Sequence, residues 1–340
     1  MFIAADTLDD LLRRVITKVL DKGHRVVPTR GKNTELFGVL LQLNNPRARL
    51  SRTEKRRALF SCLGEFLWYL SKKNTLPFIA YYASRYEKES EDGETVRTGY
   101  GPRLFLNNGH DQIANVIATL KQKPSSRRAV MQIFEAADGA VDQKEAPCTC
   151  TIQFAIRAGK LHMMTFMRSN DIYYGLPHDV FAFTMMQEII ARSLDVKLGK
   201  YIHAVGSLHL YDEHRKDAKK MLNEGWQEDI PMPHMPKVDP WPALQQLLLI
   251  ETQLREEQAV NIEGLSLDSY WKDLARLLQV YRLFRDTNND EIDNVKKLMS
   301  VDVYHPFIDQ KRRTQAKKRK PPSSRQLNLS LSPRRAATAK

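Results

Sequence analysis

Four short segments in the middle of the chain carry side chains that could do chemistry together. Cys148 follows a proline and precedes a β-prone run, and the string Arg168-Ser169-Asn170-Asp171 comes later. Residues 175–179 contain glycine, proline, histidine and aspartate, and His209 and Tyr211 form the fourth segment. A cysteine thiolate is a strong nucleophile, and a neighbouring guanidinium lowers the pKa of the thiol. Each segment alone is weak evidence, because a buried cysteine is more often inert.

The cysteines do not indicate a disulfide framework or a metal site. Cys62, Cys148 and Cys150 are too few to staple a chain of 340 residues. The pair Cys148-x-Cys150 is closer than a usual zinc pair, and no second Cys/His pair follows at a suitable distance. We therefore expect no metal. Because residues two apart on a strand point to the same face, we expect Cys148 and Cys150 to face the same way.

In this order the segments resemble the thymidylate synthase family. Its pattern is a Pro-Cys nucleophile, an Arg-Ser-x-Asp-x-x-x-Gly-x-Pro stretch and a His-x-Tyr pair, and only Cys148 follows the proline. The resemblance covers about residues 25–214 with the motifs in register. Further matching positions are Arg30, Glu65, Tyr100-Gly101 and Arg127-Arg128.

The resemblance implies a reaction and a role for each matching residue. A thiolate at Cys148 would add to C6 of a pyrimidine nucleoside monophosphate, which makes C5 nucleophilic toward the one-carbon unit of 5,10-methylenetetrahydrofolate. The implied roles are these: Arg30, Arg168 and Ser169 bind the 5′-phosphate; Arg127 and Arg128 reach the phosphate site of a neighbouring subunit in a homodimer with shared active sites; His209 and Tyr211 bind the sugar 3′-hydroxyl; Glu65 and Tyr100 organise proton transfers and water; Asp171 and Gly175 belong to the folate site.

Simpler explanations exist for several of these residues. Arg127-Arg128 alone would more often be a solvated surface pair, and Glu65 an exposed acid on a helix. Glu65 lies among Leu63, Phe66 and other apolar residues, so a buried carboxylate there would need a partner. The 3′-hydroxyl does not distinguish ribose from deoxyribose, and the resemblance favours deoxyribose.

Asp179 is the informative departure from the family pattern, which has asparagine there. An amide side chain can donate to O4 of uracil and accept from its N3–H. A carboxyl group can instead accept from the amino group of cytosine and donate a proton to its N3. A polar mismatch of this kind can set substrate choice by orders of magnitude. The same aspartate marks the deoxycytidylate hydroxymethylase branch of the family, and the alternative is neutral drift at a position that does not contact the base.

Other departures concern the fate of the new carbon. Thr149 replaces the usual histidine, Met167 replaces a glutamine, and residues 78–89 contain tyrosines where the family has a tryptophan that excludes water. A wetter site favours hydroxymethylation over methylation. The expected product is 5-hydroxymethyl-dCMP. The alternatives are a thymidylate synthase or dCMP methyltransferase, and an inactive relative that binds nucleotide or nucleic acid.

Helical and strand patterns alternate in the way that an α+β domain requires. The resemblance adds a thymidylate-synthase-like fold, a mixed β-sheet packed with helices whose free sheet face forms the dimer interface. For the first helix, Asp6 or Thr7 is a plausible N-terminal cap and Gly23 a plausible stop, and Thr53 is a possible cap for the second helix. Gly159 completes a hairpin turn. We expect helices at 7–22, 53–70, 111–123, 178–193, 243–257, 267–285 and 290–299, and strands at 35–43, 128–134, 149–156, 160–167 and 201–211.

The net charge of +13 is concentrated at the end of the chain. Residues 311–340 hold 11 Lys/Arg and no acid, so the remainder has 42 basic against 40 acidic residues. We expect a disordered basic tail at 311–340 that could contact polyanions. Residues 1–310 would form one catalytic domain, with the motifs in 25–214 and a divergent helical part at 215–310.

The chain carries no pattern for membrane insertion or export. No apolar run reaches the roughly 18 residues that span a bilayer. The first residues, MFIAADTLDD, contain acids where a signal peptide needs basic and then apolar residues. We expect a cytoplasmic protein in a reducing compartment.

Overall fold

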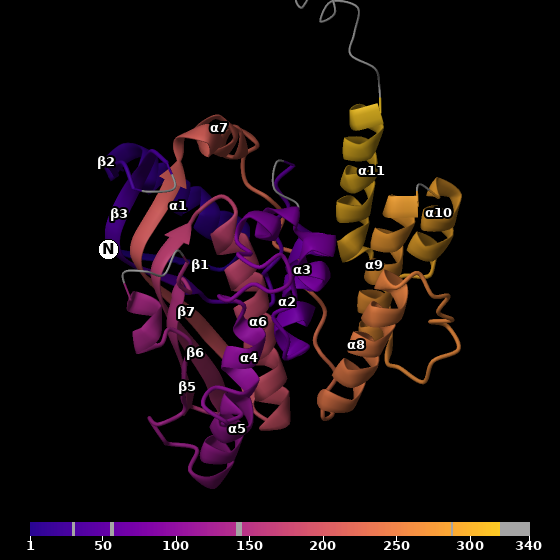
Figure 1. Ribbon diagram of the computed structural model, residues 1–340, viewed down its shortest axis with the longest axis horizontal. Coiled ribbons are helices and arrows are strands. Elements are labelled where there is room, and N and C mark those ends of the chain that lie inside the picture. Colours follow the sequence, from indigo (N-terminus) through magenta and orange to yellow (C-terminus); the bar gives the residue numbers. More distant parts are fainter. Residues whose placement is uncertain (29–30, 55–57, 141–144, 287, 320–340) are drawn as a thin grey trace, which may run out of the picture.

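A mixed β-sheet organises the part of the chain that the computed structural model describes, residues 1–28, 31–54, 58–140, 145–286 and 288–319 (Figure 1). Its seven strands follow the order β1-β3-β7-β6-β5-β4, and β2 pairs with β3 off this path. β1 is parallel to β3 and β6 is parallel to β7, whereas the other pairs are antiparallel. The strands are β1 (Phe2–Ala5), β2 (His24–Val26), β3 (Asn33–Leu43), β4 (Val130–Gln132), β5 (Thr149–Arg157), β6 (Lys160–Asp171) and β7 (Lys197–Tyr211).

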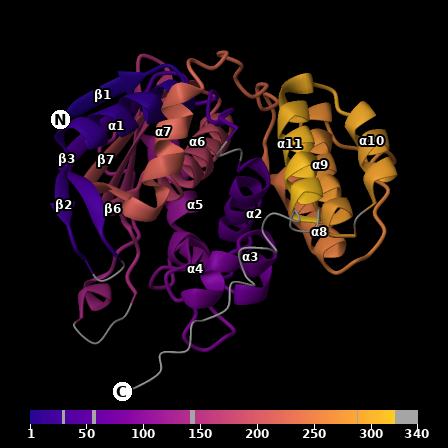
Figure 2. The same ribbon diagram turned by 90° about the horizontal axis from the view of Figure 1, so that it is seen from above.

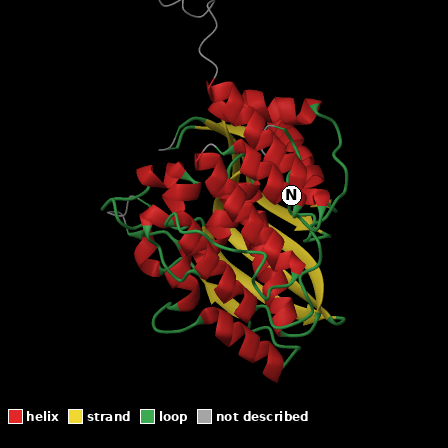
Figure 3. Ribbon diagram, turned by 90° about the vertical axis from the view of Figure 1, so that its right-hand side faces the viewer, coloured by secondary structure: helices red, strands yellow, loops and turns green. Residues whose placement is uncertain are grey.

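Helices cover one face of the sheet and stand in front of the strands in Figure 3. The longest, α6, is buried from Leu176 to Ala191 because it contacts β6 and β7 on one side and α2 on the other. None of the helices in the described ranges is long and apolar enough to cross a membrane. The α-helices are α1 (Leu8–Lys22), α2 (Leu59–Leu70), α3 (Leu76–Tyr82), α4 (Tyr100–Phe105), α5 (Gln112–Gln122), α6 (Gly175–Ser193), α7 (Arg215–Asn223), α8 (Trp241–Arg255), α9 (Ser269–Asp286), α10 (Asn289–Lys297) and α11 (His305–Arg319), and the 3-10 helices are η1 (Ser84–Lys88), η2 (Ala136–Gly139), η3 (Asp212–His214) and η4 (Asp302–Tyr304).

This architecture confirms the expected α+β fold, and several local predictions hold with it. The Thr7 side chain accepts a hydrogen bond from the Asp10 amide and so caps α1. The hairpin between β5 and β6 turns at Ala158 and Gly159, whose φ angles of 48° and 69° lie in the left-handed region. Gly23 ends α1, where a Cβ would lie 2.5 Å from the Val19 carbonyl oxygen.

Two predicted boundaries are wrong by more than five residues. Helix α2 begins at Leu59 and not at Thr53, because the Thr53 hydroxyl lies 3.3 Å from Ser51 in a buried polar cluster and does not cap a helix. Helix α11 continues to Arg319, so residues 311–319 are helical where composition predicted disorder. The rest of the expected basic tail, 320–340, lies outside the described residues.

The four C-terminal helices α8–α11 lie side by side, next to α2 and α3 (Figure 2). Aromatic side chains join the two groups, with the ring of Tyr281 in α9 centred 5.7 Å from Phe60 and 5.0 Å from Tyr82. The ammonium group of Lys311 lies 4.5 Å from the centre of the Tyr281 ring, a cation–π contact that ties α11 to the same cluster. The divergent C-terminal part therefore packs on α2, the helix that carries Glu65, and on α3.

Candidate active site

The sequence motifs meet at one end of the sheet. β5 begins there and β6 and β7 end there, while α6 begins four residues after β6. This arrangement brings Cys148, just before β5, next to the last residues of β6. Helices α2 and α4 close the site from the helical layer, since α2 packs on α6 and on α4.

The side chain of Arg168 holds the segment that carries Cys148. Its Nε donates to the Pro147 carbonyl at 2.9 Å and an Nη donates to the Ala146 carbonyl at 2.8 Å. The Arg168 backbone amide donates to the Cys148 carbonyl at 2.8 Å. These three bonds fix the backbone of the segment from which the Cys148 side chain projects.

Tyr100, the first residue of α4, links the cysteine segment to the helices. Its hydroxyl accepts hydrogen bonds from the Thr149 hydroxyl at 2.9 Å and the Thr149 amide at 3.3 Å. Burial, with Asp179 and Cys148 nearby, raises the pKa of Tyr100 well above its usual value. The phenol therefore stays protonated, and its hydrogen remains available to a bound molecule.

Glu65 in α2 is buried and receives several donors. Tyr69 donates at 2.8 Å, Tyr86 at 2.6 Å and Arg85 at 3.0 Å, and His178 Nε2 lies 3.9 Å away. Burial alone would raise the pKa of Glu65, but the charge of Arg85, with His178 and the two hydroxyls, outweighs it and holds the pKa below the usual value. Glu65 is thus an ionised carboxylate.

Asp179, in the first turns of α6, has the opposite state. It is buried, and its Oδ2 accepts a hydrogen bond of 2.6 Å from Nδ2 of Asn170. Burial and then the neighbouring charge of Glu65 raise the pKa of Asp179 to about 8, although the Asn170 contact lowers it. Asp179 is therefore largely a neutral carboxylic acid at pH 7. Neighbouring titratable groups with separated pKa values are typical of acid–base sites.

Asn170 was not assigned a role from the sequence, because it stands at the variable position of the Arg-Ser-x-Asp string. Its oxygen lies 3.2 Å from Nε2 of His203, whose Nδ1 lies 2.6 Å from the Tyr201 hydroxyl. All three side chains are buried. A Cβ at Gly175 would lie 2.9 Å from the Asn170 nitrogen, so glycine leaves the space that this amide occupies.

The remaining motif residues lie together where β6 and β7 end. Asp171 pairs with His209 across these strands, and Ser169 pairs with Ser207. The rings of His209 and Tyr211 are 4.9 Å apart. The carboxylate of Asp171 accepts from the backbone amides of Tyr173 at 3.2 Å and Tyr174 at 2.7 Å, which fixes its orientation.

A comparison with known families identifies the family of the chain. The model of the family described as thymidylate synthase matches residues 7–253. The chain belongs to the thymidylate synthase family. Membership supports a folate-dependent transfer of a one-carbon unit to C5 of a pyrimidine nucleoside monophosphate, with methylenetetrahydrofolate as co-substrate. The match includes α7 and most of α8, whereas α9–α11 lie beyond it.

The paired arginines of the thymidylate synthase motif lie apart from this cluster. Arg127 and Arg128 are exposed on the segment that leads into β4, an edge strand of the sheet. The Arg127 carbonyl accepts from Gln153 in the middle of β5, several residues from the end where Cys148 lies. Arg30 lies outside the described residues.

The strand alternation expected at Cys148 and Cys150 is interrupted. The pairing of β5 with β6 shifts between Thr149 and Thr151, and the Cys150 carbonyl accepts from the amides of both Ile133 and Phe134. This β-bulge removes the basis for predicting that the two thiols face the same way. Burial raises the pKa of the Cys150 thiol despite the opposing effect of Arg168, which makes Cys150 a poor nucleophile.

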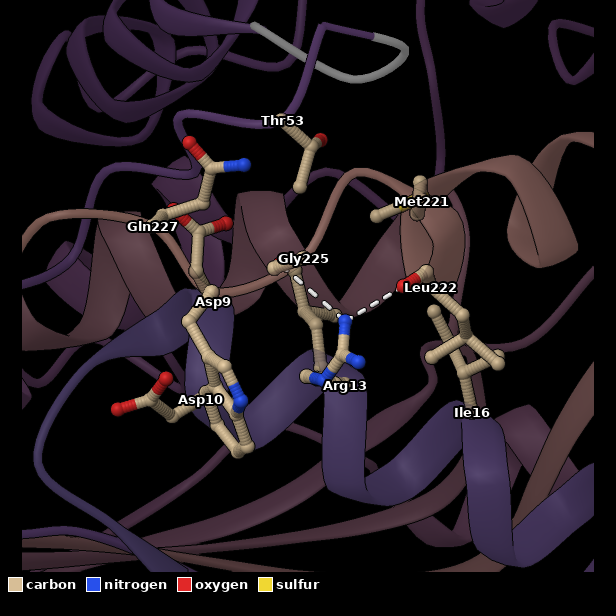
Figure 4. A pocket seen from close by; sticks show the side chains of 11 residues that line it. Asp9, Asp10, Arg13, Ile16, Thr53, Met221, Leu222, Gly225 and Gln227 are labelled. Atoms are coloured by element: carbon tan, nitrogen blue, oxygen red, sulfur yellow. Dashed lines mark hydrogen bonds between the residues drawn. The ribbon is translucent and has the colours of Figure 1, made fainter.

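Elsewhere, a small pocket between α1 and the chain after α7 contains none of these residues (Figure 4). Its volume of about 10 Å³ is close to the least that a water molecule needs. Arg13 crosses it to donate to the carbonyls of Leu222 at 2.6 Å and Gly225 at 3.2 Å. These bonds satisfy carbonyls at the end of α7 and give the pocket a structural role.

Proposed function

We propose that this enzyme is a deoxycytidylate 5-hydroxymethyltransferase, which converts dCMP to 5-hydroxymethyl-dCMP with 5,10-methylenetetrahydrofolate. The observation that carries the proposal is Asp179, a buried and largely neutral carboxylic acid at the position where the family pattern has asparagine. A carboxylic acid offers one donor and one acceptor. Cytosine needs both, a donor for N3 and an acceptor for its amino group.

Cys148 is the proposed nucleophile toward C6 of the base. Arg168 binds the Ala146 and Pro147 carbonyls and so fixes the segment from which the thiol projects. Its positive charge favours the thiolate, and the bond from sulfur to C6 leaves C5 electron-rich. With Ser169 and Arg30, Arg168 would also bind the 5′-phosphate, and His209 and Tyr211 the 3′-hydroxyl.

Glu65 and Tyr100 are the proposed groups for proton transfer and for holding water. Glu65 is an anion with fixed donors, so it can accept a proton or order a water near the base. Tyr100 accepts from Thr149 and keeps its own hydrogen to donate. Because Arg85 and Tyr86 are not fully buried, solvent reaches this side of the site, which supports addition of water to the new carbon.

The folate site is proposed at Asp171 and Gly175. Asp171 is half-buried, and two backbone amides hold its carboxylate while each oxygen keeps a further lone pair for an N–H donor of a pterin. The residues present therefore fit the co-substrate. Bound methylenetetrahydrofolate supplies a one-carbon unit at the oxidation level of formaldehyde.

A homodimer through the helix-free face of the sheet is part of the proposal. Met164 and Phe166 in β6 are 39% and 43% exposed, and the register places them beside Ile202 and Ala204 of β7. Exposed apolar side chains in neighbouring rows are typical of an interface. In such a dimer the exposed Arg127 and Arg128 would complete the phosphate site of the partner subunit.

The test is to incubate the protein with methylenetetrahydrofolate and either dCMP or dUMP, and to weigh the product. We expect dCMP to gain CH2O, with C5–H replaced by C5–CH2OH and no dihydrofolate absorbance. The Cys148→Ser variant is the control and should form no product. Turnover of dUMP without dCMP would overturn the assignment of the base.

Methylation with folate oxidation is the second candidate, and one observation favours it. Trp68 is fully buried, with its ring 5.8 Å from Tyr69 and 5.3 Å from Tyr86, two of the partners of Glu65. A tryptophan from α2 thus lies beside the site although residues 78–89 contain none. A product heavier by CH2, formed with dihydrofolate, would select this candidate.

A further inference from the structure

Four buried side chains form a hydrogen-bonded row that ends at Asp179. Tyr201 and His203 project from β7, Asn170 from β6 and Asp179 from α6. The successive distances are 2.6 Å from Tyr201 to His203, 3.2 Å from His203 to Asn170 and 2.6 Å from Asn170 to Asp179. Each is within hydrogen-bond range, so the row is continuous from the sheet to the proposed base-binding carboxyl.

The donors in this row all point toward Asp179. Burial lowers the pKa of His203 to about 3, so its ring is neutral and only one of its nitrogens carries a hydrogen. The Asn170 nitrogen faces Asp179, and the Asn170 oxygen therefore faces His203 and requires the hydrogen on Nε2. Nδ1 of His203 then accepts from the Tyr201 hydroxyl. This is the arrangement in which Asn170 donates to Asp179 whether that carboxyl is charged or neutral.

A donor fixed on one carboxyl oxygen decides where the acid proton can be. An amide N–H can only donate, and the carbonyl oxygen of a carboxylic acid accepts more strongly than its hydroxyl oxygen, so the 2.6 Å contact favours Oδ2 as the carbonyl oxygen and the proton on Oδ1. A free carboxylic acid could place its proton on either oxygen. One placement matches the donor–acceptor pattern of cytosine and the other matches that of uracil, because the two bases present reversed edges.

We propose that Asn170, oriented by His203 and Tyr201, is a specificity-determining positioning residue that confines the Asp179 proton to Oδ1 and lets Asp179 match one pyrimidine edge only. Which base that edge belongs to rests on the proposed function, but the confinement of the proton does not. Gly175 serves the same contact, since a Cβ there would lie 2.9 Å from the Asn170 nitrogen and 3.5 Å from Oδ2 of Asp179.

The test is the ratio of kcat/KM for dCMP to kcat/KM for dUMP in wild type and in Asn170→Leu. We expect the ratio to fall by about tenfold in Asn170→Leu. In wild type the Asn170 N–H opposes a proton on Oδ2 of Asp179, and leucine removes that opposition. A ratio of two substrates on one preparation is independent of the fraction of enzyme that is folded. Loss of stability alone would lower both values equally.

Gln187→Leu is the matched control. Gln187 is a buried amide on α6 that donates to the Leu161 carbonyl at 2.9 Å, and it does not belong to the row. We expect it to leave the ratio unchanged. If Asn170→Leu does not fold, His203→Phe decides, because it removes the donor that orients Asn170 and should narrow the ratio by about threefold.

The outcomes separate this inference from the proposed function. A folded Asn170→Leu variant with the wild-type ratio overturns the inference, as does an unchanged ratio in His203→Phe when Asn170→Leu is unfolded. A wild type that prefers dUMP overturns the assignment of cytosine. In that case a narrowed ratio in Asn170→Leu still supports the role of Asn170.

Discussion

Glu65 and Asp179 are neighbouring buried carboxyls, and the pockets around them differ in how many donors they supply. The Glu65 pocket, built by α2 and η1, contributes two tyrosine hydroxyls and the guanidinium of Arg85. The Asp179 pocket, built by α6, β6 and β7, contributes the amide of Asn170. The pKa of the first carboxyl is lowered and that of the second is raised to about 8.

The difference teaches that burial alone does not set the charge of a site carboxyl. Burial raises the pKa of both groups, and a nearby cation with several hydrogen bonds reverses the result for one of them. The charge of Glu65 then adds to the effect of burial on Asp179, so the pKa of Asp179 depends on the Glu65 pocket. The candidate site thereby holds an anion and a neutral acid side by side.

Among the variants that test the contrast between the two carboxyls, Glu65→Gln should have the largest effect. The variant keeps the shape of the side chain but removes the charge that accepts protons or orders water. We expect kcat to fall by about 10²–10⁴-fold, the range for loss of a positioned acid–base group. The measurement is steady-state turnover, with binding of dCMP as the control for folding. A loss below tenfold would exclude Glu65 as a proton-transfer group.

Arg85→Met would unbalance the Glu65 pocket and leave the hydrogen bond from Asn170 to Asp179 in place. Loss of one partner of a buried pair costs about 3–5 kcal/mol, and we expect about 2 kcal/mol here because the Arg85 side chain is 34% exposed. The pKa of Glu65 should rise. Urea unfolding measures the loss, and Arg25→Met is the control, since the side chains of Arg25 and its partner Asp212 are 59% and 35% exposed and the change should be below about 1 kcal/mol. Equal stabilities for the two variants would contradict the prediction.

Much of the fold could be predicted from the sequence because periodicity reports burial directly. The strands around the hairpin at Gly159 and the apolar helix α6 follow from alternation and composition. The start of α2 was missed because a threonine that looks like a cap, Thr53, is used in another contact. The extent of α11 was missed because its basic composition hides the packing of Lys311 on Tyr281.

The residues of the candidate site could be predicted where they belong to sequence motifs. They could not be predicted where their partners are distant in the sequence. Cys148, Arg168 and Asp179 stand at motif positions. Arg85 is twenty residues from Glu65, and no spacing rule joins a helix acid to a later 3-10 helix. Asn170 contacts His203 although the two are not register partners, since Asn170 pairs with Leu208 and His203 with Thr165, and no sequence pattern indicates this contact.

The last expected effect is a pH dependence of stability that distinguishes the two carboxyls. The folded pKa of Asp179, about 8, lies above its ordinary value of 3.8, so the folded protein holds a proton that the unfolded chain releases between these values. The stabilisation is fully present below the ordinary pKa and is lost as pH rises toward 8. Wild type should therefore lose stability relative to Asp179→Asn by at most about 1.4 kcal/mol per pH unit. Urea unfolding of both proteins between about pH 5.5 and 8 measures the difference. A constant difference across that range would mean that Asp179 is ionised in the folded protein, and the contrast between the two pockets would then disappear.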